Sequence, residues 1–224
     1  MHFLCLIRRV SGNEAMNKTM KLNLGCGSRV VDGWVNVDYA LGARLMKFPL
    51  FAAVNRHVRF FDMDWDHRVF IHDLRRRFPW GDGLVDAIYS SHTLEHLSKS
   101  DGRQFLAECF RVLKPGGLIR IIVPDLAALV SAYNASKLMA DDFLIKLEVL
   151  NKDSGSSMRK IVNALVSHPH RCMYDTKRLL SILNDIGFDA ASSQPFESAI
   201  EDIRSIESAD RTLDAVIVEG RKPL

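Results

Sequence analysis

Short apolar runs alternate along the chain with segments of helical periodicity. The runs lie near residues 20–24, 34–38, 69–72, 85–90 and 118–123, and turn-forming residues bound each of them. Such runs are typical of buried strands. Strands that alternate with helices usually form a parallel sheet with helices on its faces. The pattern therefore predicts an α/β fold, which a last apolar run at 213–219 completes.

Residues 101–113 give the clearest helical pattern, with apolar side chains every three or four positions. Ser100 is placed to cap the start of this helix, and Pro115 with two following glycines ends it. Further helices are predicted at 126–134, at 141–150, and at 175–186 with Asp175 or Thr176 as its cap and Gly187 at its end. Residues 45–58 also look helical, interrupted by Pro49.

The runs at 21–24 and 35–38 are the most informative. The first ends at Gly25-Cys26-Gly27 and the second ends at Asp38. In neighbouring parallel strands, the glycine turn and Asp38 meet at one edge of the sheet. Glycines there let a ligand lie against bare backbone N–H groups, and a carboxylate there can accept hydrogen bonds from a ribose diol. The pair predicts a site for a nucleoside-bearing cofactor, although a purely structural turn and cap remain the alternative.

The same turn lacks the features of a phosphate-binding loop. The dinucleotide fingerprint needs a third glycine where this chain has Val30, and its acidic residue follows after about 20 positions, much later than Asp38. No Gly-Lys-Ser/Thr follows either, so the P-loop pattern fails. A nucleoside cofactor without phosphates, such as S-adenosylmethionine, fits better, and a nucleotide-dependent oxidoreductase is disfavoured.

An ordered series of motifs carries a family resemblance. Leu-Asn-Leu-Gly-Cys-Gly is followed by Gly-Trp-Val-Asn-Val-Asp, His72-Asp73-Leu74, Ser90-Ser91-His92, Leu94-Glu95-His96 and Arg-Val-Leu-Lys-Pro-Gly-Gly. The series resembles the class I S-adenosylmethionine-dependent methyltransferases of the small-molecule type, most of all a bacterial branch. The resemblance covers about residues 20–125 well and 168–222 loosely. Two departures are Arg29, where relatives carry a small residue, and Asn23, where many have a carboxylate.

The resemblance implies a Rossmann-like, doubly wound, seven-stranded sheet, mostly parallel with an antiparallel C-terminal strand. One such domain would span 21–224, with a flexible lead-in at 1–20 and insertions near 39–66 and 126–167. The first crossover helix must be short. The implied cofactor-binding residues are Asn23, Gly25, Cys26, Gly27, Asp38, Asp73, Leu74 and Ser90. Asp73 would accept from the adenine amino group with Leu74 against the ring, although Asp73 as a simple cap is the alternative.

His92 follows the fourth strand, where the resemblance places the methyl group. Histidine titrates near neutral pH, so His92 is the candidate general base. Orientation of the two reactants can carry much of the rate without a base. The expected acceptor is a small-molecule or sugar-like compound, and a cluster at His168, His170, Arg171 and Tyr174 either faces it or forms a surface loop. The runner-up function is a binding module of the same fold without turnover.

His92-x-x-Glu95-His96 also matches the zinc signature H-x-x-E-H. That signature needs a helix with both histidines on one face, whereas this segment begins at a strand end. By resemblance, a divalent cation at Glu95 and His96 is a further, less favoured alternative. We expect no metal, and we interpret Glu95 and His96 as a pair that orders the loop.

Composition limits the possible partners and the cellular compartment, and it does not change the predicted fold or site. A net charge of +3 gives no strong basic surface, so no nucleic-acid partner is expected. The four cysteines form no CxxC pair, which favours a reducing, cytoplasmic setting without disulfides. No stretch reaches the roughly 20 apolar residues of a transmembrane segment. Nothing in the sequence sets the oligomeric state.

Overall fold

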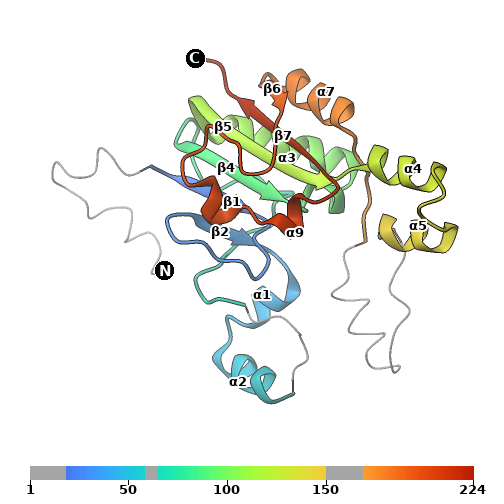
Figure 1. The fold of residues 1–224 in the computed structure, drawn as a ribbon. Coiled ribbons are helices and arrows are strands. Elements are labelled where there is room, and N and C mark those ends of the chain that lie inside the picture. Colours follow the sequence, from blue (N-terminus) through green and yellow to red (C-terminus); the bar gives the residue numbers. More distant parts are fainter. Residues whose placement is uncertain (1–18, 59–64, 150–168) are drawn as a thin grey trace.

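A single mixed sheet organises the computed structural model, which describes residues 19–58, 65–149 and 169–224 (Figure 1). In this part of the chain seven strands pair in the order β3-β2-β1-β4-β5-β7-β6. The first five strands are parallel, and β7 is antiparallel to both β5 and β6. The strands are β1 (Lys21–Leu24), β2 (Val35–Asp38), β3 (Phe70–Ile71), β4 (Val85–Ser91), β5 (Leu113–Pro124), β6 (Asp189–Ser192) and β7 (Ala215–Arg221). The predicted fold class is confirmed.

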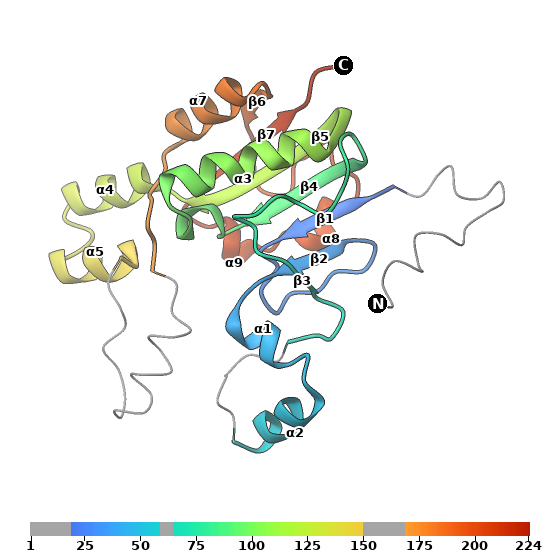
Figure 2. The ribbon, with the colours of Figure 1, turned by 180° about the vertical axis from the view of Figure 1, so that it is seen from behind.

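Helices lie on both faces of this sheet and beyond one edge. α3 (Lys99–Val112) and α7 (Thr176–Ile186) cover one face, as the rear view shows (Figure 2). The short helices α8 (Ile203–Ile206) and α9 (Ala209–Thr212) lie on the other face. The remaining helices are α1 (Leu41–Leu45), α2 (Pro49–Val58), the 3₁₀ helix η2 (Leu94–His96), α4 (Leu126–Asn134) and α5 (Ala140–Leu147). None of the helices in these ranges is long and apolar enough to cross a membrane.

The larger core lies under α3 and α7. The predicted stripe on α3 is buried, with Phe105, Leu106, Cys109 and Val112 at most 1% exposed. These side chains pack against β-branched and leucine residues of β1, β4 and β5. Burial of one helix face against a sheet is the main source of stability in such a layer. The α3 layer thereby fixes the positions of the strand ends that carry the candidate site.

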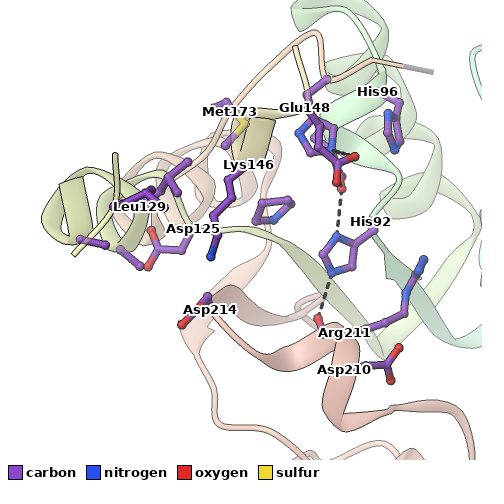
Figure 3. Close-up of a pocket in the computed structure, with 16 residues that line it drawn as sticks. His92, His96, Asp125, Leu129, Lys146, Glu148, Met173, Asp210, Arg211 and Asp214 are labelled. Atoms are coloured by element: carbon purple, nitrogen blue, oxygen red, sulfur yellow. Dashed lines mark hydrogen bonds and ion pairs between the residues drawn. The ribbon is translucent and has the colours of Figure 1, made fainter. Parts of the chain in front are cut away.

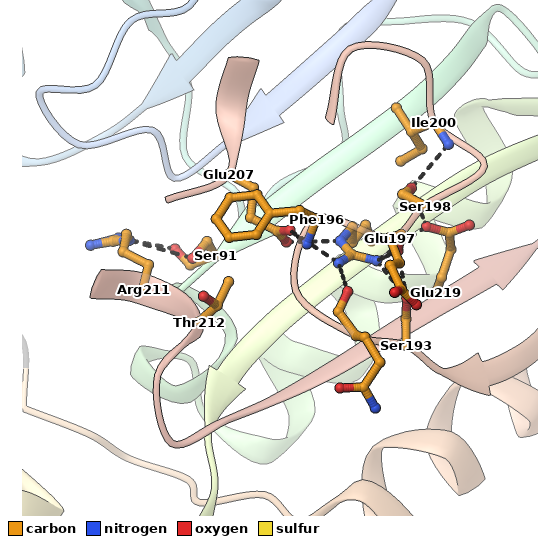
Figure 4. Close-up of polar contacts among 12 residues, drawn as sticks. Ser91, Ser193, Phe196, Glu197, Ser198, Ile200, Glu207, Arg211, Thr212 and Glu219 are labelled. Atoms are coloured by element: carbon orange, nitrogen blue, oxygen red, sulfur yellow. Dashed lines mark hydrogen bonds and ion pairs between the residues drawn. The ribbon is translucent and has the colours of Figure 1, made fainter. Parts of the chain in front are cut away.

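A buried arginine holds the segment between β6 and α8 on the opposite face (Figure 4). Arg120 of β5 is fully buried, and its Nε donates to Glu207 Oε1 at 2.9 Å. Its other nitrogens donate to Ser193 Oγ and to the Gln194 carbonyl at 2.9 and 2.7 Å. A buried charge needs this degree of pairing. The network therefore ties the segment that leads into α8 and α9 to the sheet.

Several sequence expectations need correction. Ser98, not Ser100, caps α3, because the Ser98 side chain accepts from the Asp101 N–H. β5 already begins at Leu113, which pairs with Val85, and a register shift before Leu118 accommodates the predicted turn at 114–117 within the strand. β2 follows β1 through turns alone, so the short crossover helix is absent from residues 25–34. α5 ends at Leu147 because Glu148 adopts a left-handed conformation (φ 51°).

Pro49 begins α2 rather than interrupting a helix, and it separates α2 from α1. Proline fits the first turn of a helix, where its missing N–H has no partner to lose. The predicted lead-in and parts of both predicted insertions lie outside the described residues. The assignment of 21–224 to a single domain stays a prediction.

Candidate active site

The carboxyl ends of the parallel strands bring the predicted site residues to one edge of the sheet. Leu24 of β1 pairs with Val37 of β2, so the glycine turn and Asp38 follow adjacent strand ends. Ser91 of β4 pairs with Ile122 of β5, and the next residue, His92, donates its N–H to the Ile122 carbonyl at 2.9 Å. In open α/β sheets, ligands bind at this edge.

The glycine turn is closed by hydrogen bonds to β2. The N–H groups of Gly25 and Cys26 both donate to the Val37 carbonyl, at 2.9 and 3.1 Å. The Gly27 N–H donates to Asp38 Oδ2 at 2.8 Å. The expectation of bare N–H groups is therefore wrong, because the neighbouring strand satisfies them. A phosphate needs free donors at such a turn, so this geometry fits a cofactor without phosphates.

Asp38 stabilises the same turn from the end of β2. Its second oxygen, Oδ1, accepts from the Ala40 N–H at 2.7 Å, and the residue is half-buried. A carboxylate offers about four acceptor positions. Two are used by the backbone, which leaves acceptor capacity for a diol. Recognition of ribose by Asp38 remains a prediction.

Three further residues predicted to bind the cofactor are buried around the turn. Asn23 is 4% exposed, and its amide donates to Asn36 Oδ1 at 2.9 Å and to the Arg29 carbonyl at 3.3 Å. Ser90 is 1% exposed and donates to the Leu24 carbonyl at 3.0 Å. Burial, followed by the charge of Asp38, raises the pKa of the Cys26 thiol to about 12. Asn23 and Ser90 brace the turn, and Cys26 stays protonated at neutral pH.

Asp73 and Leu74 follow β3 at the same edge. The Arg75 guanidinium donates to both oxygens of Asp73 at 2.8 Å, and these hydrogen bonds lower the pKa of the carboxyl group. Leu74 is 8% exposed and belongs to the larger core. Arg75 is exposed to solvent and pairs with Asp73 from there. Contact of Asp73 and Leu74 with adenine remains a prediction.

A cavity of about 590 Å³ opens beside the end of β4 (Figure 3). His92, Lys146 and Arg211 reach it from three different elements, namely the end of β4, α5 and α9. Most of the lining side chains are ionisable: His92, Glu95, His96, Asp125, Lys146, Glu148, His170, Asp210, Arg211 and Asp214. The cavity is therefore suited to a polar ligand.

His92 lies between a carbonyl and a carboxylate. Its Nε2 is 2.9 Å from the Arg211 carbonyl oxygen, and its Nδ1 is 3.3 Å from Glu95 Oε1. Because a carbonyl only accepts, Nε2 carries the ring proton, which leaves the lone pair on Nδ1. His92 also has a positive φ of 49°, a strained conformation held by the backbone bond to β5. The residue lines the cavity, and its catalytic role remains a prediction.

His170 enters the cavity from the segment that precedes α7. Its Nδ1 is 2.8 Å from the Leu147 carbonyl oxygen, and its N–H donates to the Glu148 carbonyl at 3.0 Å. The N–H groups of Arg171 and Cys172, which follow His170, donate to the backbone carbonyl of Glu95 at 2.8 and 3.0 Å. His170 is thus fixed against both η2 and the end of α5. Of the predicted cluster, His170 lines the cavity, Arg171 is exposed, Tyr174 is buried outside it, and His168 lies outside the described residues.

Glu95, His96 and His170 could hold a metal ion. Each offers one ligand atom, and these atoms lie within 4.8 Å of one another. Glu95 and His96 are neighbours in the H-x-x-E-H segment, whereas His170 is distant in sequence and joins them only in the folded chain.

Thr93 connects the glycine turn to the cavity loop. Its hydroxyl donates to the Ser91 carbonyl at 3.2 Å. A Cβ built on Gly25 would lie only 2.0 Å from Thr93 Oγ1. The turn and the loop that begins at His92 are therefore in direct contact, so a cofactor at the turn and an acceptor in the cavity would be neighbours.

Several cavity residues escaped the sequence analysis. Lys146, Asp210 and Arg211 lie on α5 and α9, which carry no motif. Asp125 could have been predicted from the sequence, since it directly follows Pro124 at the end of β5. The rule that ligands bind at carboxyl strand ends would have selected Asp125.

Comparison with known proteins agrees with this arrangement. Residues 22–121 match the family described as "Methyltransferase domain". A probable S-adenosylmethionine-dependent methyltransferase of Mycolicibacterium smegmatis is 43% identical over 47 residues, which are 21% of this chain and only 18% of that protein. A SAM-dependent methyltransferase from Methanosarcina mazei has a similar fold, with a TM-score of 0.51 at 16% identity, covering 93% of this chain and 95% of that one. Residues 22–121 therefore match a methyltransferase domain, and the fold of the chain is similar to that of a SAM-dependent methyltransferase.

Proposed function

We propose that the chain transfers the methyl group of S-adenosylmethionine to a nucleophile of a small, polar acceptor, such as a sugar-like compound, bound in the 590 Å³ cavity. The position of this cavity carries the proposal. It opens at His92, whose neighbour Thr93 contacts Gly25 of the glycine turn. Its volume lies within the range of about 300–1,000 Å³ typical of small-ligand sites.

The cofactor would lie along the carboxyl ends of β1, β2 and β3. Asp38 keeps acceptor capacity for the ribose diol, and the N–H groups of Gly25, Cys26 and Gly27 are already engaged, which disfavours a diphosphate. Asn23, Gly25, Cys26, Gly27 and Ser90 shape this surface. Asp73 and Leu74 would meet the adenine at its far end. This arrangement supports S-adenosylmethionine over NAD.

Transfer needs an in-line approach of the acceptor to the methyl carbon. For a hydroxyl acceptor, the oxygen forms the new bond to carbon while the electron pair of the carbon–sulfur bond returns to sulfur. The acceptor proton passes to Nδ1 of His92, because Nε2 already donates to the Arg211 carbonyl. The products are a methyl ether and S-adenosylhomocysteine, and His92 then releases the proton to solvent.

The ionisable lining favours a polar acceptor over an apolar one. Lys146 and Arg211 can donate to acceptor oxygens, and Asp125 and Asp214 can accept from hydroxyl or amino groups. An apolar acceptor would leave these groups desolvated without partners, which is unfavourable.

Calorimetry with S-adenosylmethionine and with NAD is the first test. Asp38→Ala should weaken S-adenosylmethionine binding, while Asp32→Ala is a matched control in an exposed turn, where Asp32 pairs with Arg68. Release of S-adenosylhomocysteine is then measured with sugars, phenols and amines as acceptors. Binding without release for any acceptor would indicate a binding module. Tight NAD binding without S-adenosylmethionine binding would refute the proposal.

A further inference from the structure

The carboxylate of Glu95 is buried without a hydrogen bond. Its side chain is 0% exposed, and neither oxygen accepts a hydrogen bond from the described residues. An ionised carboxylate in such a place is costly unless a charge or a metal ion compensates it. The histidines around it are His92, with Nδ1 at 3.3 Å from Oε1, and His170, with Nε2 at 3.9 Å.

His170 presents a bare ring nitrogen to this carboxylate. Its Nδ1 lies 2.8 Å from a backbone carbonyl and so carries the ring proton, which leaves the lone pair on Nε2. A histidine held by a carbonyl at one nitrogen and free at the other is the usual form of a metal ligand. Nε2 lies 3.9 Å from Glu95 Oε1 and 3.8 Å from Glu148 Oε2. Both separations exceed the roughly 3.2 Å limit of a hydrogen bond, so a proton on Nε2 would reach neither oxygen well.

The same separations suit a cation placed between the atoms. At a tetrahedral zinc with bonds of about 2.1 Å, ligand atoms lie roughly 3.4 Å apart. The ligand atoms of Glu95, His96 and His170 lie within 4.8 Å of one another. Side-chain rotations would close the remaining difference, while backbone hydrogen bonds already fix η2 to the segment at His170.

We propose that Glu95, His96 and His170 bind a divalent transition-metal cation such as Zn²⁺ or Mn²⁺ in the wall of the acceptor cavity. Two imidazoles and one carboxylate favour these ions over Mg²⁺, which prefers oxygen ligands. Three protein ligands leave a coordination position open. Glu148, 54% exposed at its side chain, is near enough to His170 to approach that position.

Such a cation would act on the acceptor, a role that rests on the proposed methyl transfer. An acceptor oxygen at the open position would be polarised, so that its proton leaves more easily to His92. The binding of the cation itself requires no assumption about methyl transfer.

Metal binding to the full chain, purified without a histidine tag and stripped with chelator, tests the proposal. Titration calorimetry with Zn²⁺ and Mn²⁺ should show one site, and Mg²⁺ should bind at least tenfold more weakly. Glu95→Gln and His170→Gln should each weaken Zn²⁺ binding at least tenfold. Glu201→Gln and His67→Gln are matched controls at exposed positions, and both should stay within twofold.

The failures are distinguishable. Equal affinity in site and control variants would mean an adventitious ion only, and the proposal would fall, as it would if the parent chain bound no ion. If the site variants do not fold by circular dichroism, the visible spectrum of Co²⁺ bound to the parent chain decides. Strong bands of a four- or five-coordinate ion support the site, and the weak bands of a hydrated ion refute it. S-adenosylmethionine binding, measured separately, tests the proposed function alone.

Discussion

Gly25 and Gly27 should differ sharply when each is replaced by alanine. Both have positive φ angles, 75° and 58°, which cost an alanine about 1–2 kcal/mol. A Cβ at Gly27 meets nothing within 4 Å. A Cβ at Gly25 would lie 2.0, 2.7 and 2.8 Å from Oγ1, Cγ2 and Cβ of Thr93. Rotation of Thr93 cannot relieve the clash, because its Cβ is itself too close.

The extra cost at Gly25 follows from this contact. Overpacking typically destabilises by about 1–3 kcal/mol. Gly25→Ala should therefore lower the free energy of unfolding by about 2–5 kcal/mol, against about 1–2 kcal/mol for Gly27→Ala. With a urea m-value of about 2 kcal/mol/M, the unfolding midpoint falls by about 1–2.5 M for Gly25→Ala and about 0.5–1 M for Gly27→Ala.

Urea denaturation followed by circular dichroism measures both variants. Thr93→Gly, alone and combined with Gly25→Ala, completes a double-mutant cycle. The combined variant should recover about 1–3 kcal/mol relative to the sum of the single changes. Equal losses for the two glycine variants, or no recovery in the cycle, would refute the assigned contact between the turn and the Thr93 loop.

Three further predictions follow from other contacts. Asp38→Ala should weaken S-adenosylmethionine binding by about 10- to 150-fold in calorimetry, and it should also lower the urea midpoint, because both oxygens accept backbone N–H groups; unchanged affinity would make Asp38 a turn residue only. His92→Ala should leave cofactor affinity within about threefold while methyl transfer falls by about 10²–10⁴; full activity of the variant would exclude a catalytic role for His92. Hydrogen bonds from Arg111 lower the pKa of Glu108 below its usual 4.5, so the stabilisation is complete above pH 4.5 and is lost as pH falls through the lowered value. Glu108→Gln should therefore destabilise by about 1.5–3 kcal/mol at pH 7, with a gap to the parent that closes in acid; a gap independent of pH would contradict this.

The order and kind of the main elements could be read from the sequence. α3 and α7 repeat apolar residues at helical spacing, and Asp175 and Gly187 mark the ends of α7 by short-range chemistry. The strands were predictable because each is an apolar run bounded by turn-forming residues. These patterns depend only on residues close together in the sequence, so they can be recognised without the tertiary structure. Ser100 was the wrong cap for α3, because the helix begins two residues earlier and the Ser98 side chain accepts from the Asp101 N–H.

The candidate site was predictable only where it follows strand ends. Asp38, Asp73 and His92 lie at the predicted edge because parallel strands all end there. The state of the glycine turn was not predictable, since its N–H groups bond to a carbonyl supplied by the neighbouring strand.

The sequence by itself determined the sheet, its flanking helices and the edge at which a ligand would bind, because hydrophobic periodicity and turn chemistry act over a few residues. Only the tertiary structure placed His170 beside Glu95 and the Arg211 carbonyl 2.9 Å from His92. Those contacts join segments far apart in the chain. No local pattern encodes them, because they arise when the packing of α5, α9 and η2 around the sheet brings their side chains to a common cavity.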